Sequence, residues 1–276
     1  MLTTAPCSQT VWGETAAGEP FAVVDDVVPP GLHFLAVPGL RTLLTPGMLA
    51  VGEALADACA QRRFVCVLGD AGIGKTFAVR TAAHRLGAAV LLGLRAQPAP
   101  ADLRAGLHGA LGLTGTPPAD PGAADTLIRR ALADTPRIVV VDDADRMSGS
   151  CLEYLRFLHD GTPGGLCVVL IAGQRGERHL RAQRMLATRT AAWLHLGALT
   201  RDQIPLAVPA LHPLWQAVVP GHLQALDARF ACGSLRRWVL LTHHTQRALA
   251  ATGAAVPDAR LLQTVVDRID TAGRRP

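Results

Sequence analysis

The sequence predicts an α/β fold, a parallel five-stranded sheet with helices on both faces, followed by a small all-helical lid. Three observations predict it. Five apolar runs of strand length alternate with helical segments between residues 63 and 196, an order typical of a parallel sheet. A glycine-rich stretch, residues 69–76, joins the first of these strands to a helix. The last ~75 residues contain helical patterns only.

The expected strands are runs of apolar, often β-branched residues without polar alternation, as in strands buried on both faces. Pro46 and Ser234 are suited to begin helices, and Gly87 and Gly253 to end them. The strands are expected at residues 63–68, 88–94, 136–141, 166–172 and 192–196, and the helices at 47–62, 76–86, 101–113, 123–133, 150–159, 201–208, within 222–231, 234–251 and 258–270.

The composition excludes two classes of protein. The chain has 276 residues, 49% of them apolar and 18% charged, so it can build a large core and does not have the composition of a disordered protein. No apolar run reaches the ~18–20 residues that a membrane span needs, and no secretory signal is visible. The six cysteines are scattered, so we expect reduced thiols, a cytoplasmic location and no membrane partner.

The glycine-rich stretch has the pattern G-x-x-x-x-G-K-[ST] between a buried strand and a helix. Its glycines would let backbone N–H groups curl around phosphate oxygens, and the helix dipole adds positive potential. Lys75, the single lysine among 27 Lys and Arg residues, would reach the β- and γ-phosphates, and the Thr76 hydroxyl would bind Mg²⁺. We therefore expect ATP and Mg²⁺ to be bound by Gly69, Asp70, Ala71, Gly72, Ile73, Gly74, Lys75 and Thr76.

Carboxylates follow the expected strand 136–141, at the end where open α/β sheets bind ligands. Asp142 would hold Mg²⁺ directly or through water. Asp143 would orient or deprotonate the attacking water, and Asp145 is the weaker candidate because it falls on the following turn. Many ATPases of this layout carry Glu in the second position. Since Asp is one methylene shorter, we expect hydrolysis to be slow or to use a shifted water.

These patterns divide the chain into three parts. Residues 1–45 form an N-terminal arm that is partly extended, because acidic and proline pairs at residues 25–30 and Pro38 interrupt any long element. Residues 46–199 form the nucleotide-binding core, and residues 200–276 form the helical lid.

With these motifs in this order, the chain resembles the AAA+ ATPases among the P-loop NTPases, and within them the transposition regulators of the TniB/TnsC/MuB type. The resemblance covers residues 46 to 270. Its most specific parts are the Walker A loop at residues 69–76 and the Walker B strand that ends in Asp142 and Asp143. Three further stretches are similar to family signatures: Val168–Gln174 to sensor 1, Leu186–Ile204 to the arginine, strand and L-T-x-x-x-I lid opening, and Gly233–Arg237 to the G-N-L-R of sensor 2.

The resemblance implies roles for three residues outside the Walker motifs. Gln174 would read the γ-phosphate or position water, although the family more often has Asn, Ser or Thr there. Arg236 would reach from the lid to the nucleotide. Arg189 would act in trans as an arginine finger on the neighbouring subunit's ATP, which requires an oligomer. Arg181 and Arg184 compete with Arg189 for that role, and each arginine could instead be an ordinary surface residue.

The distribution of charge favours a polyanionic partner. Residues 175–189 hold five Arg and one Glu, and residues 200–276 hold nine Arg and five Asp, against a net charge of +5 for the whole chain. Arg178, Arg181 and Arg184 recur every third residue and would share one side of a helix. No helix-turn-helix or zinc-finger pattern is evident. Contacts with double-stranded DNA would therefore be mostly to phosphates and independent of sequence.

The sequence thus predicts an ATP-dependent AAA+ regulator that forms a homo-oligomer, a ring or filament, on DNA and recruits or activates a transposase or integrase. Two alternatives stay open: a nucleotide-gated scaffold with little hydrolysis, and a helicase loader or signalling ATPase. A small-molecule kinase fits less well, because the acidic pair and the C-terminal lid suit hydrolysis better.

Overall fold

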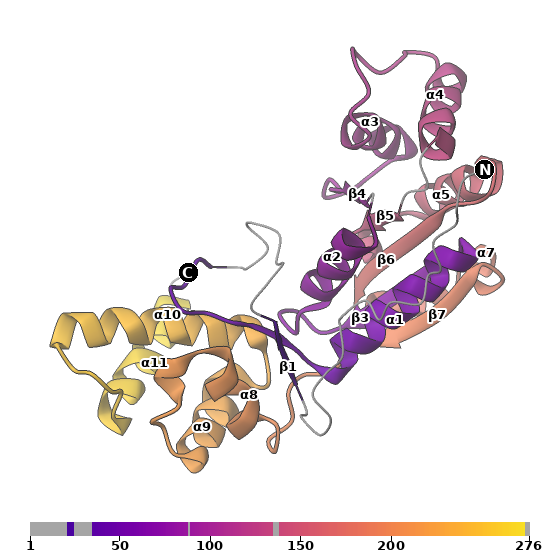
Figure 1. The fold of residues 1–276 in the computed structure, drawn as a ribbon. Coiled ribbons are helices and arrows are strands. Elements are labelled where there is room, and N and C mark those ends of the chain that lie inside the picture. Colours follow the sequence, from indigo (N-terminus) through magenta and orange to yellow (C-terminus); the bar gives the residue numbers. More distant parts are fainter. Residues whose placement is uncertain (1–20, 25–34, 88, 135–137, 274–276) are drawn as a thin grey trace. The chain divides into compact units, whose positions relative to one another are not determined.

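The computed structural model describes residues 21–24, 35–87, 89–134 and 138–273 (Figure 1). By their contacts these residues form two compact units, which we describe separately. The first unit consists of Gly47–Asp70 and Lys75–Leu196. The second consists of Ala71–Gly74, the chain from Gly197 onward and the described part of Thr15–Pro46. The described residues of the expected arm thus pack with the C-terminal helices.

The first unit contains the predicted parallel sheet. Its five strands pair in the order β4-β5-β6-β3-β7, and every pair is parallel. The strands lie within one or two residues of the expected runs, although residues 88 and 136–137 of those runs fall outside the described residues. The strands are β3 (Phe64–Gly69), β4 (Ala89–Leu92), β5 (Ile138–Val141), β6 (Cys167–Gly173) and β7 (Thr190–His195).

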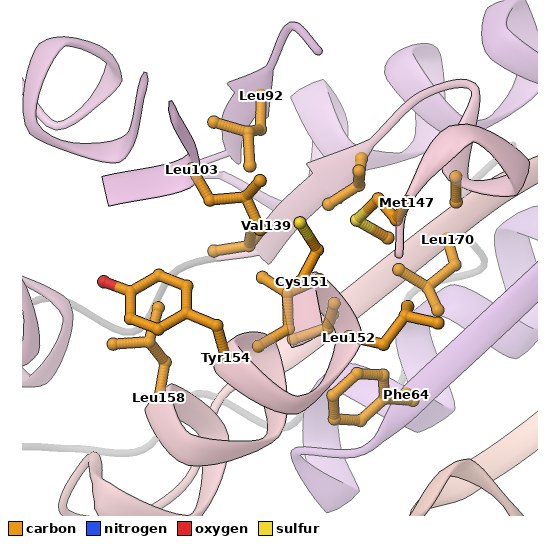
Figure 2. Packing of buried hydrophobic residues seen from close by; sticks show 14 of the residues in the cluster. Phe64, Leu92, Leu103, Val139, Met147, Cys151, Leu152, Tyr154, Leu158 and Leu170 are labelled. Atoms are coloured by element: carbon orange, nitrogen blue, oxygen red, sulfur yellow. The ribbon is translucent and has the colours of Figure 1, made fainter. Parts of the chain in front are cut away.

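Helices cover both faces of this sheet, as predicted. Alternate residues of β3 face opposite sides, and Phe64, Cys66 and Leu68 join one buried cluster with residues of the helices α3 to α7; Figure 2 shows part of this cluster. Val65 and Val67, which lie between them, are equally buried, and the buried residues of α1 and α2 lie outside that cluster. The helices are α1 (Pro46–Gln61), α2 (Lys75–Leu86), α3 (Pro100–Ala110), α4 (Pro121–Asp134), α5 (Gly149–Gly161), α6 (Gly176–Arg181) and α7 (Arg184–Ala187), with a 3₁₀ turn η1 (Ala144–Arg146).

One expectation about this unit is wrong. Arg178, Arg181 and Arg184 do not share one helix, because α6 ends at Arg181 and Gln183 has an extended backbone (ψ 98°) before α7 begins. A three-residue spacing places side chains on one side only while the helix continues. The three arginines therefore do not form a continuous basic stripe.

The second unit is helical in its C-terminal part, as predicted, and adds a small antiparallel sheet from the expected arm. Phe21, Val37 and Leu43 join its buried cluster. Among the helices that the structure describes, none combines the length and the apolar composition that a membrane span requires. The elements are β1 (Ala22–Val24), β2 (Thr42–Leu44), α8 (Ile204–Leu211), the 3₁₀ turn η2 (Pro213–Trp215), α9 (Pro220–Leu226), the π-helical turn η3 (Asp227–Ala231), α10 (Leu235–Thr252) and α11 (Ala259–Gly273).

A buried carboxylate sets the direction of α10. Asp227 accepts hydrogen bonds from the Gly233 N–H at 2.8 Å and from the Trp238 indole N–H at 3.0 Å. Between these groups the chain turns through Cys232 and Gly233, which both have left-handed backbones (φ 49° and 71°). Ser234 then caps α10, and its hydroxyl accepts from the Arg237 N–H. The chain can therefore reverse sharply before α10 without leaving these donors unpaired.

Replacing Asp227 with Ala should destabilise the protein by ~2–4 kcal/mol, because two buried donors would lose their acceptor. Urea unfolding followed by tryptophan fluorescence measures this change. Asp202→Ala, at an exposed position, is the control and should change the stability by no more than ~0.5 kcal/mol. Equal unfolding midpoints for the two variants would contradict the role given to Asp227.

Candidate nucleotide-binding site

The topology of the sheet brings the predicted Walker residues of the first unit to one edge. Strands β5, β6 and β3 are neighbours and run in the same direction, with Gly69 paired to Gly173 and Val141 paired to Leu170. Their carboxyl ends therefore meet. Asp142 follows β5, Gln174 follows β6, and the loop that leads to α2 follows β3. Open α/β sheets bind ligands at this edge.

The loop needs glycine at three of its positions. Gly69, Gly72 and Gly74 have φ values of 146°, 82° and 101°, which residues with a Cβ rarely adopt. Gly72, in the second unit, has a second constraint, since a Cβ there would lie 2.6 Å from the Ser234 hydroxyl oxygen and 3.0 Å from the Arg236 Cβ. The three glycines of the motif are thus required by the backbone path.

Lys75 is the first residue of α2, and its ammonium group folds back over the loop. Its Nζ donates to the carbonyl oxygens of Gly69 at 2.8 Å and Asp70 at 2.7 Å. An ammonium has three donors, and the N-terminus of a helix carries partial positive charge. The positive potential of Lys75 and of α2 is therefore concentrated at the loop, where an anion would bind.

The two predicted Mg²⁺ ligands lie in contact. The Thr76 hydroxyl donates to Oδ2 of Asp142 at 2.9 Å, although the two residues lie 66 positions apart. The other carboxylate oxygen, Oδ1, accepts from the Asp143 N–H at 2.9 Å. A hydroxyl and a partly buried carboxylate supply the oxygen ligands that Mg²⁺ prefers, and a protein site for Mg²⁺ often uses only one or two carboxylates besides the phosphates. The donor set therefore fits Mg²⁺.

The two other carboxylates, Asp143 and Asp145, differ in the groups that they contact. Asp143 is exposed and has a left-handed backbone (φ 52°), which Asp tolerates better than most residues; its Oδ2 lies 3.3 Å from a guanidinium nitrogen of Arg146. Asp145 instead accepts from the Gly173 N–H at 3.3 Å, where β6 ends. Asp145 thus holds the end of a strand, and Asp143 is the carboxylate better able to meet a water molecule.

Sequence reasoning missed a cluster near Gln174. Gln174 is exposed after β6, and in α6 the carboxylate of Glu177 accepts from His195 at 2.9 Å and Arg181 at 2.6 Å. These two bonds lower the pKa of Glu177. His195 pairs with Leu68 in the sheet, one residue before the loop. In the sequence, the only signal was that His195 lies near the end of the expected strand 192–196.

Arg189 is held within its own unit. Its Nε and a terminal nitrogen lie 2.9 and 2.8 Å from the two oxygens of Asp160, a two-point ion pair. Arg181 is paired with Glu177 and stacks on Trp193 at 4.3 Å. Arg184 is exposed, and no ion pair of its side chain is found among the described residues. The three candidate trans arginines therefore differ in the side-chain contacts that each would have to break before it could reach a neighbouring subunit.

Arg236, the fourth expected catalytic residue, lies in the first turn of α10 in the second unit. Its side chain is exposed, and its backbone N–H donates to the Gly72 carbonyl at 2.9 Å. The Cδ of Arg236 would lie 3.7 Å from a Cβ at position 72. The side chain thus starts beside the tip of the glycine-rich loop.

Comparisons with known proteins agree with this architecture. Residues 59–180 match a family model described as an AAA domain. None of the curated proteins matches the chain. Among solved structures, the Aeropyrum pernix ORC2 protein in its ADPNP and ADP complexes superposes with a TM-score of 0.66 at 16% identity, over 88% of this chain and 70% of that one.

Two further structures are similar. The Aeropyrum pernix ORC1 protein in complex with DNA gives a TM-score of 0.62 at 16% identity, over 81% of this chain and 64% of that one. The Thermotoga maritima RuvB Holliday junction branch migration motor gives 0.54 at 14% identity, over 80% and 67%. At these identities the likeness establishes the fold, an AAA+-like α/β core with C-terminal helices.

The Asp160–Arg189 ion pair should give the protein a pH-dependent contribution to stability. Hydrogen bonds from Arg189 above all, then from His159 and Arg156, hold the pKa of Asp160 well below its ordinary value. A lowered folded-state pKa stabilises the fold above the pKa of the unfolded chain, ~3.9, and this contribution is lost as the pH falls further. Asp160→Asn should therefore cost ~1 kcal/mol at pH 7, a value limited by partial exposure, and progressively less below pH ~4.

Thermal unfolding of both proteins between pH 3 and 7 measures this difference. Asp57→Asn, at an exposed position on α1, is the control and should track the wild type throughout. A stability difference for Asp160→Asn that stays constant down to pH 3 would contradict the assignment of the pair.

Proposed function

We propose that this protein is an ATP-dependent AAA+ regulator that assembles on double-stranded DNA and recruits or activates a transposase or integrase. The observation that carries the nucleotide part is the contact of Thr76 with Asp142 beside the Lys75 loop. It joins a hydroxyl, a carboxylate and an ammonium group at the edge where such sheets bind ligands. The AAA domain match over residues 59–180 supports the same reading.

In this proposal Lys75 exchanges its carbonyl partners for oxygens of the β- and γ-phosphates. The Thr76 hydroxyl and the Asp142 carboxylate hold Mg²⁺, which when bound neutralises charge that develops on the phosphates. Gln174, exposed just after β6, would position the attacking water or contact the γ-phosphate. Arg236 would contact the nucleotide, as the similarity of Gly233–Arg237 to sensor 2 implies.

Asp143 is the proposed base, and its surroundings suit slow turnover. Its carboxylate is exposed and lies near Arg146, so it has to leave that partner before it can accept a proton from water. The same observation favours a second candidate function, a scaffold that assembles when it binds ATP and hydrolyses little of it.

Assembly would place an arginine of one subunit at the ATP of the next. Arg189 is the proposed trans residue, and it must first leave Asp160. The ATP site of the neighbouring subunit would therefore be complete only after the Asp160–Arg189 pair within the first unit has opened. Arg184 could act without breaking such a pair, and Arg181 is the least available, since it is both paired and stacked.

The DNA part of the proposal is supported by charge and by analogy. Arg175 and Arg178 are exposed. One of the similar structures was solved in complex with DNA, and another is described as a Holliday junction branch migration motor. An oligomer would multiply weak phosphate contacts through avidity. The role in transposition rests only on the resemblance to the regulators of the TniB/TnsC/MuB type.

Asp143→Asn should abolish most ATP turnover while leaving nucleotide binding intact. A general base contributes a factor of ~10²–10⁴, so we expect kcat to fall at least about 100-fold with little change in KM. Steady-state phosphate release, with and without duplex DNA, measures this. Asp145→Asn is the matched control, because the amide oxygen can still accept from the Gly173 N–H, and it should keep turnover within about twofold of the wild type.

Wild-type turnover in the Asp143→Asn variant would remove Asp143 from the mechanism. Wild-type protein that binds ATP but shows no turnover even with DNA would leave the scaffold as the function.

DNA binding should be sensitive to salt and insensitive to sequence. Filter binding of two unrelated duplexes, with a non-hydrolysable ATP analogue present, should show similar affinities that fall steeply between 50 and 200 mM salt, because phosphate contacts release counterions. The double substitution of Arg175 and Arg178 by Ala should weaken both duplexes equally and reduce the salt slope by up to ~2. No binding at low salt in the presence of the analogue would reject the DNA part of the proposal.

A further inference from the structure

In the second unit, the tip of the glycine-rich loop binds the first turn of α10. The Gly72 carbonyl accepts from the Arg236 backbone N–H at 2.9 Å and from the Ser234 hydroxyl at 3.3 Å. The same hydroxyl accepts from the Arg237 N–H at 3.5 Å, which caps the helix. A hydroxyl has one donor and two acceptor sites, so Ser234 can make both contacts at once. One backbone oxygen of the loop is thus held by two donors from α10.

This contact determines the direction of a second group in the loop. The Gly72 carbonyl and the Ile73 N–H belong to one peptide unit, and in a planar trans peptide the two point in opposite directions. Holding the carbonyl on α10 therefore turns the Ile73 N–H away from α10. Backbone N–H groups of this loop pattern are the donors that cradle phosphate.

Packing around the loop tip leaves little freedom for another arrangement. A Cβ at position 72 would lie 2.6 Å from the Ser234 hydroxyl oxygen and 3.0 Å from the Arg236 Cβ, so a larger residue at position 72 would force these side chains to shift. Ile73 is buried, with 3% of its surface exposed. Glycine at position 72 therefore permits this approach without displacing these side chains.

The start of α10 is itself held firmly within the second unit. The Asp227 carboxylate accepts from the Gly233 N–H, and the Gly233 carbonyl accepts from the Leu199 N–H at 3.0 Å. A Cβ at position 233 would lie 2.4 Å from the Leu199 carbonyl oxygen. The donors at Ser234 and Arg236 therefore have a defined position in the helical core, and the orientation of the Gly72 peptide depends on it.

We propose that Ser234 is a positioning residue for nucleotide binding. Together with the Arg236 N–H, it holds the Gly72 carbonyl and so orients the Ile73 N–H for phosphate. The inference rests on the proposed binding of ATP at the loop. It implies that a loop held by α10 binds phosphate more tightly than a loop released from it, and by linkage that bound nucleotide holds α10 more firmly.

The test compares three variants by calorimetric titration with Mg·ATP, well below the unfolding temperature of each. Ser234→Ala removes the hydroxyl and should weaken binding about threefold to tenfold, the range expected for one net hydrogen bond. Ser234→Thr keeps the hydroxyl and should restore binding to within about twofold. Asp258→Ala is the control, because it removes the side-chain cap of α11 in the same unit without touching the loop, and its affinity should equal that of the wild type.

Wild-type affinity in Ser234→Ala, or an equal loss in Asp258→Ala, would overturn the proposal. Amide hydrogen exchange of the wild type provides a second readout that does not depend on any variant folding. The Arg236 N–H should exchange slowly without nucleotide and more slowly with Mg·ATP, and rapid exchange in both states would also overturn the proposal. If the wild type binds no Mg·ATP, the proposed function fails, and the exchange of the Arg236 N–H without nucleotide then decides whether the contact with Gly72 exists.

Discussion

The candidate site depends on how the polypeptide leaves β3. The chain has to pass from a buried parallel strand into a helix within a few residues, and it does so through three glycines in conformations that other residues rarely adopt. That path places the Lys75 ammonium over the carbonyls of Gly69 and Asp70 and brings the Thr76 hydroxyl to Asp142. The other expected residues at this sheet edge, Asp143 and Gln174, are placed relative to this loop by the parallel pairing of β5, β6 and β3.

A second feature of the molecule is that several arginines are held in pairs. Arg189 binds Asp160, Arg181 binds Glu177, and Arg146 lies near Asp143. In the proposed mechanism, each pair makes one of the candidate catalytic groups less available. In a protein whose activity depends on assembly, such pairs would keep an isolated subunit slow, and contacts with a neighbour could exchange them for new partners.

The strands and most helices could be predicted because their signals are local. The β-branched run that ends at Val141 predicts a strand, and the motif that ends in Thr76 predicts a phosphate-binding loop; each prediction needs only a few neighbouring residues. The break between α6 and α7 was missed, because nothing in the residues around Gln183 marks an extended conformation. The short strands β1 and β2 were missed because three residues form a strand only where tertiary contacts hold them.

In the candidate site, too, local features could be predicted and long-range contacts could not. The loop and Asp142 could be predicted from the sequence, because each directly follows a strand that is recognisable from its own residues. The contact between Glu177 and His195, and that between Gly72 and Ser234, join segments whose proximity depends on the whole fold. Ser234 was recognised as a helix cap, but only the three-dimensional structure shows that its hydroxyl also meets a carbonyl 162 residues earlier in the chain.

If the loop around Lys75 binds the phosphates of a nucleotide together with Mg²⁺, isothermal titration of the purified chain with ATP will detect it. We expect saturable heat with the wild type in the presence of Mg²⁺, weaker binding when EDTA removes the metal, and none with Lys75→Ala at the same concentrations. Equal binding by the wild type and Lys75→Ala, or no binding by either, would contradict this expectation.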